Sequence, residues 1–121
     1  MRRNQYSRDF TTQKKAEKYD NLMPLLESMS REFQELSRKK PDGALNNRKV
    51  EIVNRLLRDI HQILDGEPTR EYLDLLDEDD LPQNSDVNLI LSQTVAAMVT
   101  FKGKYRGGSM MGDPEWAIEK H

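Results

Sequence analysis

Apolar residues in the first third of the chain recur at the spacing of one helix face. Between residues 19 and 36 they are separated by alternating steps of three and four, in the order Tyr19, Leu22, Leu26, Met29, Phe33 and Leu36. Such steps place all of them on one stripe of an α-helix. Pro24 removes one backbone donor, but the stripe keeps its phase across it. We therefore expect one kinked helix from about Thr12 to Lys40.

A second helical segment follows a short turn. Segment 40–43, Lys-Pro-Asp-Gly, ends the first helix because proline cannot continue it and Asp-Gly favours a turn. Asn46 or Asn47 can cap the next helix, which is expected to end near Leu64, before Gly66. Its apolar face is formed by Val50, Val53, Leu56, Leu57, Ile60, Ile63 and Leu64. Two long helices joined by a short turn lie antiparallel, so the pattern predicts a helical hairpin.

The remaining pattern predicts one short and one long helix. Residues 68–76 open with Pro-Thr and favour a short helix. Ser85 can cap a helix over about 86–105, and no residue from Val87 to Phe101 is charged. A helix of this kind is normally buried on several sides. We expect it to fill the groove of the hairpin, giving an all-α fold with a central buried helix, a three- to four-helix bundle with flexible termini.

The ends of the chain differ in composition from this bundle. We divide the chain into a basic N-terminal tail (1–10), a helical bundle domain (11–106) and a glycine-containing C-terminal tail (107–121). Asp113 and Pro114 favour the start of a short helix in that tail. Trp116 is the only tryptophan and has the character of an anchor, docked either on the protein's own body or in a partner's groove.

Composition limits the classes of function. The 121 residues allow one domain, and the absence of cysteine excludes disulfides and thiolate chemistry. The net charge of −2 lacks the basic excess of a general nucleic-acid binder. No apolar run is long enough to span a membrane, and no secretory signal follows the first arginines. We expect a cytoplasmic protein that does not contact membranes.

Two basic patches are candidate binding sites. One flanks the hairpin turn and contains Arg38, Lys39, Lys40, Arg48 and Lys49. Cations suit the end of a helix, but those in the first turn of the second helix are unfavourable there and can bind an anion instead. The other patch contains Lys102, Lys104 and Arg106. Tyr105 lies among these cations and Gly-Gly follows, a combination that can contact single-stranded nucleic acid.

The acidic segment between the third and fourth helical stretches is a further candidate. Its binding residues are expected to be Asp74, Asp77, Glu78, Asp79 and Asp80. Carboxylates can hold a hard cation, but this segment lacks the glycine and spacing of a calcium loop. We therefore expect a solvated loop or one that pairs with basic residues of a partner, and we expect no bound metal and no cofactor.

Two observations bear on catalysis. His61 lies at the edge of an apolar stripe with no nucleophile in evidence, which favours a structural histidine. The pairs Glu32-x-x-Glu35 and Glu71-x-x-Asp74 resemble those with which all-helical nucleotide pyrophosphohydrolases of the MazG type hold Mg²⁺. The resemblance implies nucleotide hydrolysis, but a whole helix without the expected carboxylates separates the two pairs. We expect no catalytic residues.

The leading hypothesis is a non-catalytic helical protein–protein interaction protein, an adaptor, regulatory or accessory subunit of a larger assembly. Its contacts are expected at the basic turn, the acidic segment and Trp116. Opposite charges at separate ends also permit head-to-tail or antiparallel self-association. The alternatives are an accessory nucleic-acid-binding subunit that uses the basic patches and, third, the magnesium-dependent pyrophosphohydrolase.

Overall fold

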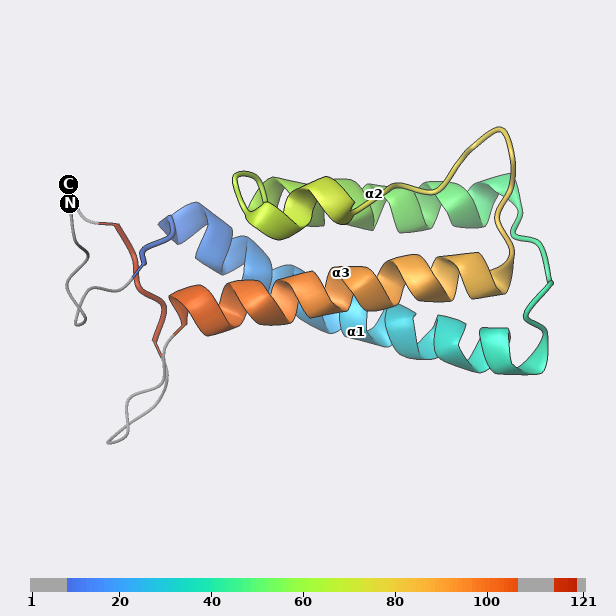
Figure 1. The fold of residues 1–121 in the computed structure, drawn as a ribbon, viewed down its shortest axis with the longest axis horizontal. Helices are drawn as coiled ribbons and strands as arrows, with labels where there is room; N and C mark the ends of the chain where they lie inside the picture. Colours follow the sequence, from blue (N-terminus) through green and yellow to red (C-terminus); the bar gives the residue numbers. More distant parts are fainter. Residues whose placement is uncertain (1–8, 107–114, 120–121) are drawn as a thin grey trace.

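Three α-helices and one short 3-10 helix make up the described part of the chain, residues 9–106 and 115–119 of a computed structural model. In chain order they are α1 (Gln13–Lys39), α2 (Asn47–Ile63), the 3-10 helix η1 (Pro68–Tyr72) and α3 (Asn84–Tyr105) (Figure 1). The predicted all-α fold is confirmed. No helix among the described residues is both long enough and apolar enough to cross a membrane.

α1 begins and ends close to the predicted positions and continues through Pro24. The Thr12 hydroxyl accepts a hydrogen bond from the Lys15 backbone amide at 3.1 Å, which caps the first turn. Figure 1 shows the first turns of α1 inclined to the rest of the helix. A proline inside a helix bends it because the ring crowds the preceding turn. The single helix expected from the unbroken stripe is confirmed.

α2 lies antiparallel to α1, so the predicted hairpin is confirmed (Figure 1). Asn46 caps α2 by accepting the Lys49 backbone amide at 2.8 Å. Gly66 follows the helix with a φ of +85°, a left-handed conformation that glycine adopts without steric cost. At the open end of the hairpin, Lys18 Nζ donates to Gln62 Oε1 at 2.6 Å.

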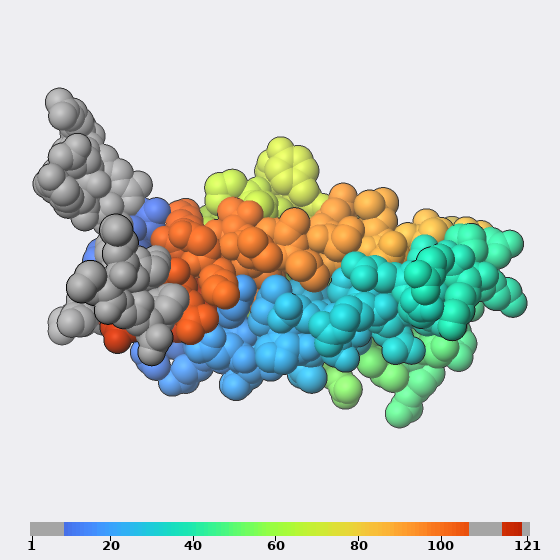
Figure 2. Space-filling view, turned by 90° about the horizontal axis from the view of Figure 1, so that it is seen from below, coloured from blue at the N-terminus to red at the C-terminus, as the bar shows by residue number. Residues whose placement is uncertain are grey.

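α3 covers one side of the hairpin and runs beside α1 over much of its length, as Figure 2 shows. Leu91, Met98 and Phe101 are fully buried on the inner face of α3. Its outer face is open, however, because Leu89 is 58% exposed and Val99 is 56% exposed. The expected burial of this helix on several sides is therefore corrected. The uncharged outer face is exposed, since the hairpin covers α3 from one side alone.

The connection from α2 to α3 is less helical than predicted. Only Pro68–Tyr72 forms a 3-10 turn, and the chain is then non-helical as far as α3. Asn54, 1% exposed on α2, explains this difference. Its side chain donates to the Leu76 carbonyl at 2.9 Å and accepts the Leu76 amide at 2.8 Å. Both backbone groups of Leu76 are thereby removed from helix formation.

The start of α3 is hydrogen-bonded to the hairpin turn. α3 is capped by Gln83 and Asp86 in a reciprocal capping box rather than by the predicted Ser85. The Ser85 amide instead donates to the Pro41 carbonyl at 3.0 Å. The Asn84 amide donates to the Gly43 carbonyl at 2.8 Å. These bonds fix the hairpin turn to the start of α3.

The described part of the C-terminal tail forms no helix. Ile118 pairs with Thr11 in an isolated parallel β-bridge, in which the Thr11 amide donates to the Ala117 carbonyl at 2.8 Å. The Ala117 amide donates to the Tyr105 carbonyl at 2.7 Å, so the tail is bound to both the start of α1 and the end of α3. The predicted helix start at 113–114 and most of the basic tail 1–10 lie outside the described residues.

Candidate functional site

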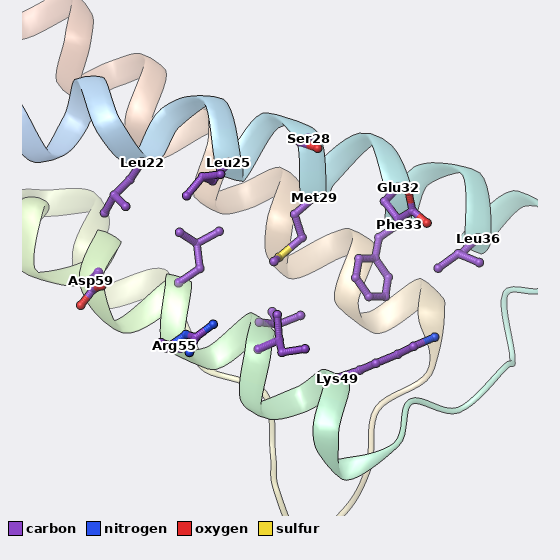
Figure 3. Close-up of a pocket in the computed structure, with 13 residues that line it drawn as sticks. Leu22, Leu25, Ser28, Met29, Glu32, Phe33, Leu36, Lys49, Arg55 and Asp59 are labelled. Atoms are coloured by element: carbon purple, nitrogen blue, oxygen red, sulfur yellow. The ribbon is translucent and has the colours of Figure 1, made fainter.

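An apolar groove runs between α1 and α2 on the side of the hairpin that α3 does not cover (Figure 3). Its volume is about 560 Å³. Met29 and Phe33 point from α1 toward α2 in Figure 3. The groove is lined by Leu22, Leu25, Ser28, Met29, Glu32, Phe33, Leu36, Lys49, Ile52, Val53, Arg55, Leu56 and Asp59. We refer to it as the hairpin groove.

The apolar stripe of α1 divides into two edges, and one of them is more deeply buried than the other. Tyr19, Leu26 and Phe33 follow one another at intervals of seven and are at least 94% buried. Leu22, Met29 and Leu36 are partly buried and line the hairpin groove. Because the stripe is wider than the surface that α3 covers, its other edge remains open.

Two exposed apolar residues extend the groove at its rims. Leu25 on α1 is 57% exposed and Ile52 on α2 is 41% exposed. Each lies beside the main apolar stripe of its helix. A few apolar residues next to that stripe were therefore the signal in the sequence that could have indicated the groove. Side chains of this size exposed beside an apolar groove are typical of interaction surfaces. This groove was not among the sites predicted from the sequence.

Four charged side chains occur along the hairpin groove. Glu32 and Asp59 are acidic, Lys49 and Arg55 are basic, and none forms an ion pair with another described residue. Figure 3 shows Lys49 near one end of the groove and Asp59 near the other. Glu32 lies toward the Lys49 end and Arg55 toward the Asp59 end in Figure 3, so each end carries one charge of each sign and the groove has no net charge.

The basic turn lies at the end of the hairpin where α1 stops and α2 starts. Arg38 and Lys39 pair with Glu35 on the same helix, and the Arg38 side chain holds the pKa of the Glu35 carboxyl below its usual value. Lys40, Arg48 and Lys49 form no ion pair with another described residue. The Asn46 cap already bonds one of the free amides at the start of α2. Anion binding at this turn stays a prediction.

The acidic segment is folded by its own hydrogen bonds. Asp77 accepts the backbone amides of Asp79 and Asp80 at 2.8 and 3.0 Å, and these bonds hold the pKa of the Asp77 carboxyl below its usual value. Glu78 pairs with Arg58 of α2 at 3.2 Å. Asp74, Asp77 and Asp80 line a shallow depression. No three acidic, histidine or cysteine side chains of the described residues are arranged to hold a metal ion.

The patch at the end of α3 is largely engaged within the protein. Lys104 Nζ lies 3.4 Å from Glu67 Oε1, and the Tyr105 hydroxyl donates to Glu67 Oε2 at 2.8 Å. Burial and this bond to Glu67 raise the pKa of Tyr105. Tyr105 is 7% exposed, so its ring has no free face on which a base could stack. Lys102 is exposed. Binding of nucleic acid by this patch stays a prediction, but Tyr105 is not placed to stack on a base.

Trp116 docks on the protein's own body. Its ring lies edge-on to Tyr19 with centroids 4.9 Å apart, and its Nε1 donates to the Asp20 carboxylate at 3.1 Å. Arg106 lies over the Trp116 ring at 5.7 Å, and Phe101 is in contact from α3. Burial raises the pKa of the Tyr19 hydroxyl to about 12. Trp116 therefore anchors the C-terminal tail on the protein's own helices.

The residues considered for catalysis do not come together. His61 is 7% exposed, and its Nε2 has no hydrogen-bond partner among the described residues. Burial and the nearby Arg70 lower its pKa, whereas Asp74 acts in the opposite direction. Among the pairs that resembled a pyrophosphohydrolase, Glu35 is already bound by cations on its own helix.

Comparison of the chain with protein-family models, with curated proteins and with solved structures found no match. The surfaces described above are therefore the basis for inferring a function.

Proposed function

We propose that the protein is a non-catalytic interaction protein, an adaptor or accessory subunit, that binds the apolar face of a partner's helix in the hairpin groove. The observation that carries this proposal is the open groove itself, with Leu25 and Ile52 exposed beside it. An amphipathic helix is the element whose side chains, at intervals of three and four residues, fit a groove between two helices.

The dimensions of the groove agree with a helical partner. Its lining on α1 extends from Leu22 to Leu36, which corresponds to about 21 Å of helix at 1.5 Å per residue. About four turns of a partner helix lie along that length. The balanced charges at the rims select neither a strongly acidic nor a strongly basic partner.

The proposal favours the groove over the charged segments for a physical reason. Charges exposed to water contribute little affinity, because they keep most of their solvation in either state. Affinity in protein interfaces comes mainly from apolar anchors that are buried on binding. The basic turn and the acidic segment would then select and orient a partner whose affinity comes from the groove.

A displayed library of amphipathic helices tests the proposal directly. We expect the protein to select helices with apolar residues at intervals of three and four. The Leu25→Glu variant should lose their binding, because it places a charge in the groove. The Leu89→Glu variant is the matched control, since Leu25 is 57% exposed on α1 and Leu89 is 58% exposed on α3. Selection of no helix, or equal binding by Leu25→Glu, would contradict the proposal.

A further inference from the structure

We propose that the surface beneath Trp116 is a second binding site, which takes an extended, tryptophan-containing segment of a partner protein and is filled in this structure by the chain's own residues 115–119. It is separate from the hairpin groove, since it lies where α1 begins and α3 ends (Figure 1). We refer to this surface as the tryptophan site. It is formed by Thr11, Tyr19, Asp20, Phe101, Tyr105 and Arg106.

The side chains of the tryptophan site contact the indole ring in three ways. The Tyr19 ring lies edge-on to it with centroids 4.9 Å apart, and the tilted Phe101 ring lies 5.9 Å away. The Arg106 guanidinium lies over the indole at 5.7 Å, within range of a cation–π contact. The Trp116 Nε1 donates to both carboxylate oxygens of Asp20, at 3.1 and 3.3 Å. Phenylalanine has no such donor, so this hydrogen bond favours tryptophan.

The backbone contacts of the tryptophan site bind an extended segment. The Thr11 amide donates to the Ala117 carbonyl at 2.8 Å, and the Thr11 carbonyl accepts the Glu119 amide at 2.8 Å. The Ala117 amide donates to the Tyr105 carbonyl at 2.7 Å. Proteins that add a peptide to an exposed backbone edge use such bonds for affinity and side-chain contacts for specificity. Ala117 is 6% exposed, so the residue after the tryptophan has to be small.

The chain's own segment fills this site incompletely. Of residues 115–119 only Ala117 is buried, while Trp116 and Ile118 are partly exposed and the two glutamates are exposed. The Nε of Arg106 is buried and has no hydrogen-bond partner among the described residues. A buried donor without an acceptor costs free energy, which a ligand that supplies an acceptor there recovers. A partner's segment can therefore bind more tightly than the chain's own.

The covalent link to the body sets the affinity that such a partner needs. Residues 107–114 join the end of α3 to the docked segment. A segment held by a short linker acts at an effective concentration on the order of 1 mM. Because the segment is docked, the same residues as a separate peptide should bind the empty site with a Kd below about 1 mM. A partner that binds more tightly displaces the tail.

NMR of the unmodified chain labelled with nitrogen-15 tests the displacement. Trp116 is the only tryptophan, so the protein gives one indole N–H signal. An unlabelled peptide of residues 113–121, Asp-Pro-Glu-Trp-Ala-Ile-Glu-Lys-His, is added to about 5 mM, above the effective concentration of the tail. We expect the signal to shift toward that of a solvent-exposed indole. The same peptide with alanine for tryptophan should leave it in place, and an unmoved signal with the intact peptide would overturn the inference.

A variant with an empty site tests the competition. Trp116→Ala combined with Ala117→Pro removes the indole and the amide that donates to Tyr105, and it keeps the full chain. Fluorescence anisotropy of the labelled peptide should give a Kd at least about tenfold lower for this variant than for the unmodified chain, because no tail competes. Circular dichroism verifies that the variant is folded. Equal affinity for both proteins would mean that the peptide binds elsewhere, which would overturn the inference.

Asp20 tests the position of the bound peptide. In the variant with the empty site, Asp20→Ala should weaken peptide binding about fivefold, because the indole loses its acceptor. Glu51→Ala is the matched control, an exposed acidic residue on α2. Equal affinities of these two proteins would contradict the assignment of the site. Amphipathic helices should bind the hairpin groove equally with the tryptophan site filled or empty, so failure of this inference leaves the proposed function to its own test.

Discussion

At the start of α1 the apolar surface is covered by the chain's own C-terminal segment, whereas farther along the same helix it lines an open groove. Tyr19 lies beneath Trp116 and beside Phe101, and the tail is bound there by backbone hydrogen bonds on both sides. Leu22, Leu25 and Met29 begin only one turn later and have no such cover. One helix therefore carries in succession a surface covered by the chain itself and the open surface proposed to bind a partner's helix.

The covered start of α1 and the open groove differ in how their apolar side chains are shielded from water. A tail joined to the body covers its surface without the loss of translational freedom that a separate molecule incurs on binding. The hairpin groove, by contrast, is shielded from water only when a separate molecule binds in it. While its own segment covers it, the start of α1 is thus expected to govern stability, and the open groove to govern association.

Two adjacent leucines on α1 give the largest contrast. Leu26 is 0% exposed and Leu25 is 57% exposed. Leu26→Ala should lower the free energy of unfolding by about 3–4 kcal/mol, because it opens a cavity in the core. Leu25→Ala should change it by less than about 0.5 kcal/mol, as is usual at exposed positions. Urea denaturation measures both, and comparable losses would show that the groove belongs to the core.

The next largest effect is expected at Asn54, which binds the connection between α2 and α3 through the backbone of Leu76. Asn54→Ala leaves the buried amide and carbonyl of Leu76 without partners and should lower stability by about 3 kcal/mol. The exposed Asn21→Ala is the control for a change of the same type on a helix surface. If the two variants were equally stable in urea, the loop would not depend on this side chain.

Trp116 tests the covered end of α1. Trp116→Ala removes the ring that contacts Tyr19 and Phe101 and should lower stability by about 2 kcal/mol, since the ring is only partly buried. Trp116→Phe retains most of the ring and loses the hydrogen bond to Asp20, so its loss should be smaller. The affinity of the hairpin groove for a partner's helix should not change in Trp116→Ala, and a large change would show that the two surfaces are not separate.

His61 is expected to give the smallest effect, and it depends on pH. Burial and Arg70 lower its pKa in the folded protein, so the unfolded chain binds a proton more readily. Stability is therefore expected to fall as the pH decreases from the usual histidine pKa of about 6.5 toward the lowered folded value. The His61→Gln variant, measured by denaturation between neutral and mildly acidic pH, should lack this decrease. An identical decrease in both proteins would assign it to other groups.

The sequence predicts where α1 and α2 begin and end, but not which of their faces α3 buries. The bounds of α1 and α2 follow from local signals such as Pro41, Asn46 and Gly66, which act within a few residues. The stripe of α1 was correctly assigned to one helix face. Nothing in its spacing shows that α3 covers only one edge, because that depends on how three helices pack.

The candidate site was harder to predict for the same reason. The charged residues chosen from the sequence stand out by type, yet Lys104 and Glu78 form ion pairs within the protein. Asn54 drew no attention because an asparagine within a helix gives no local sign of a backbone partner twenty-two residues away. The hairpin groove is formed by residues that resemble core residues, and only tertiary structure distinguishes them.

The most direct test of the proposed binding surface is an NMR titration in which an amphipathic helix selected from the library is added to protein with labelled methyl groups. We expect the signals of Leu25, Met29 and Ile52 to shift as the helix is added, while those of Leu89 and Val99 stay in place. Shifts confined to Leu89 and Val99, or no shift at any methyl group when the helix is in excess, would contradict the proposal that the protein binds a partner's helix in the hairpin groove.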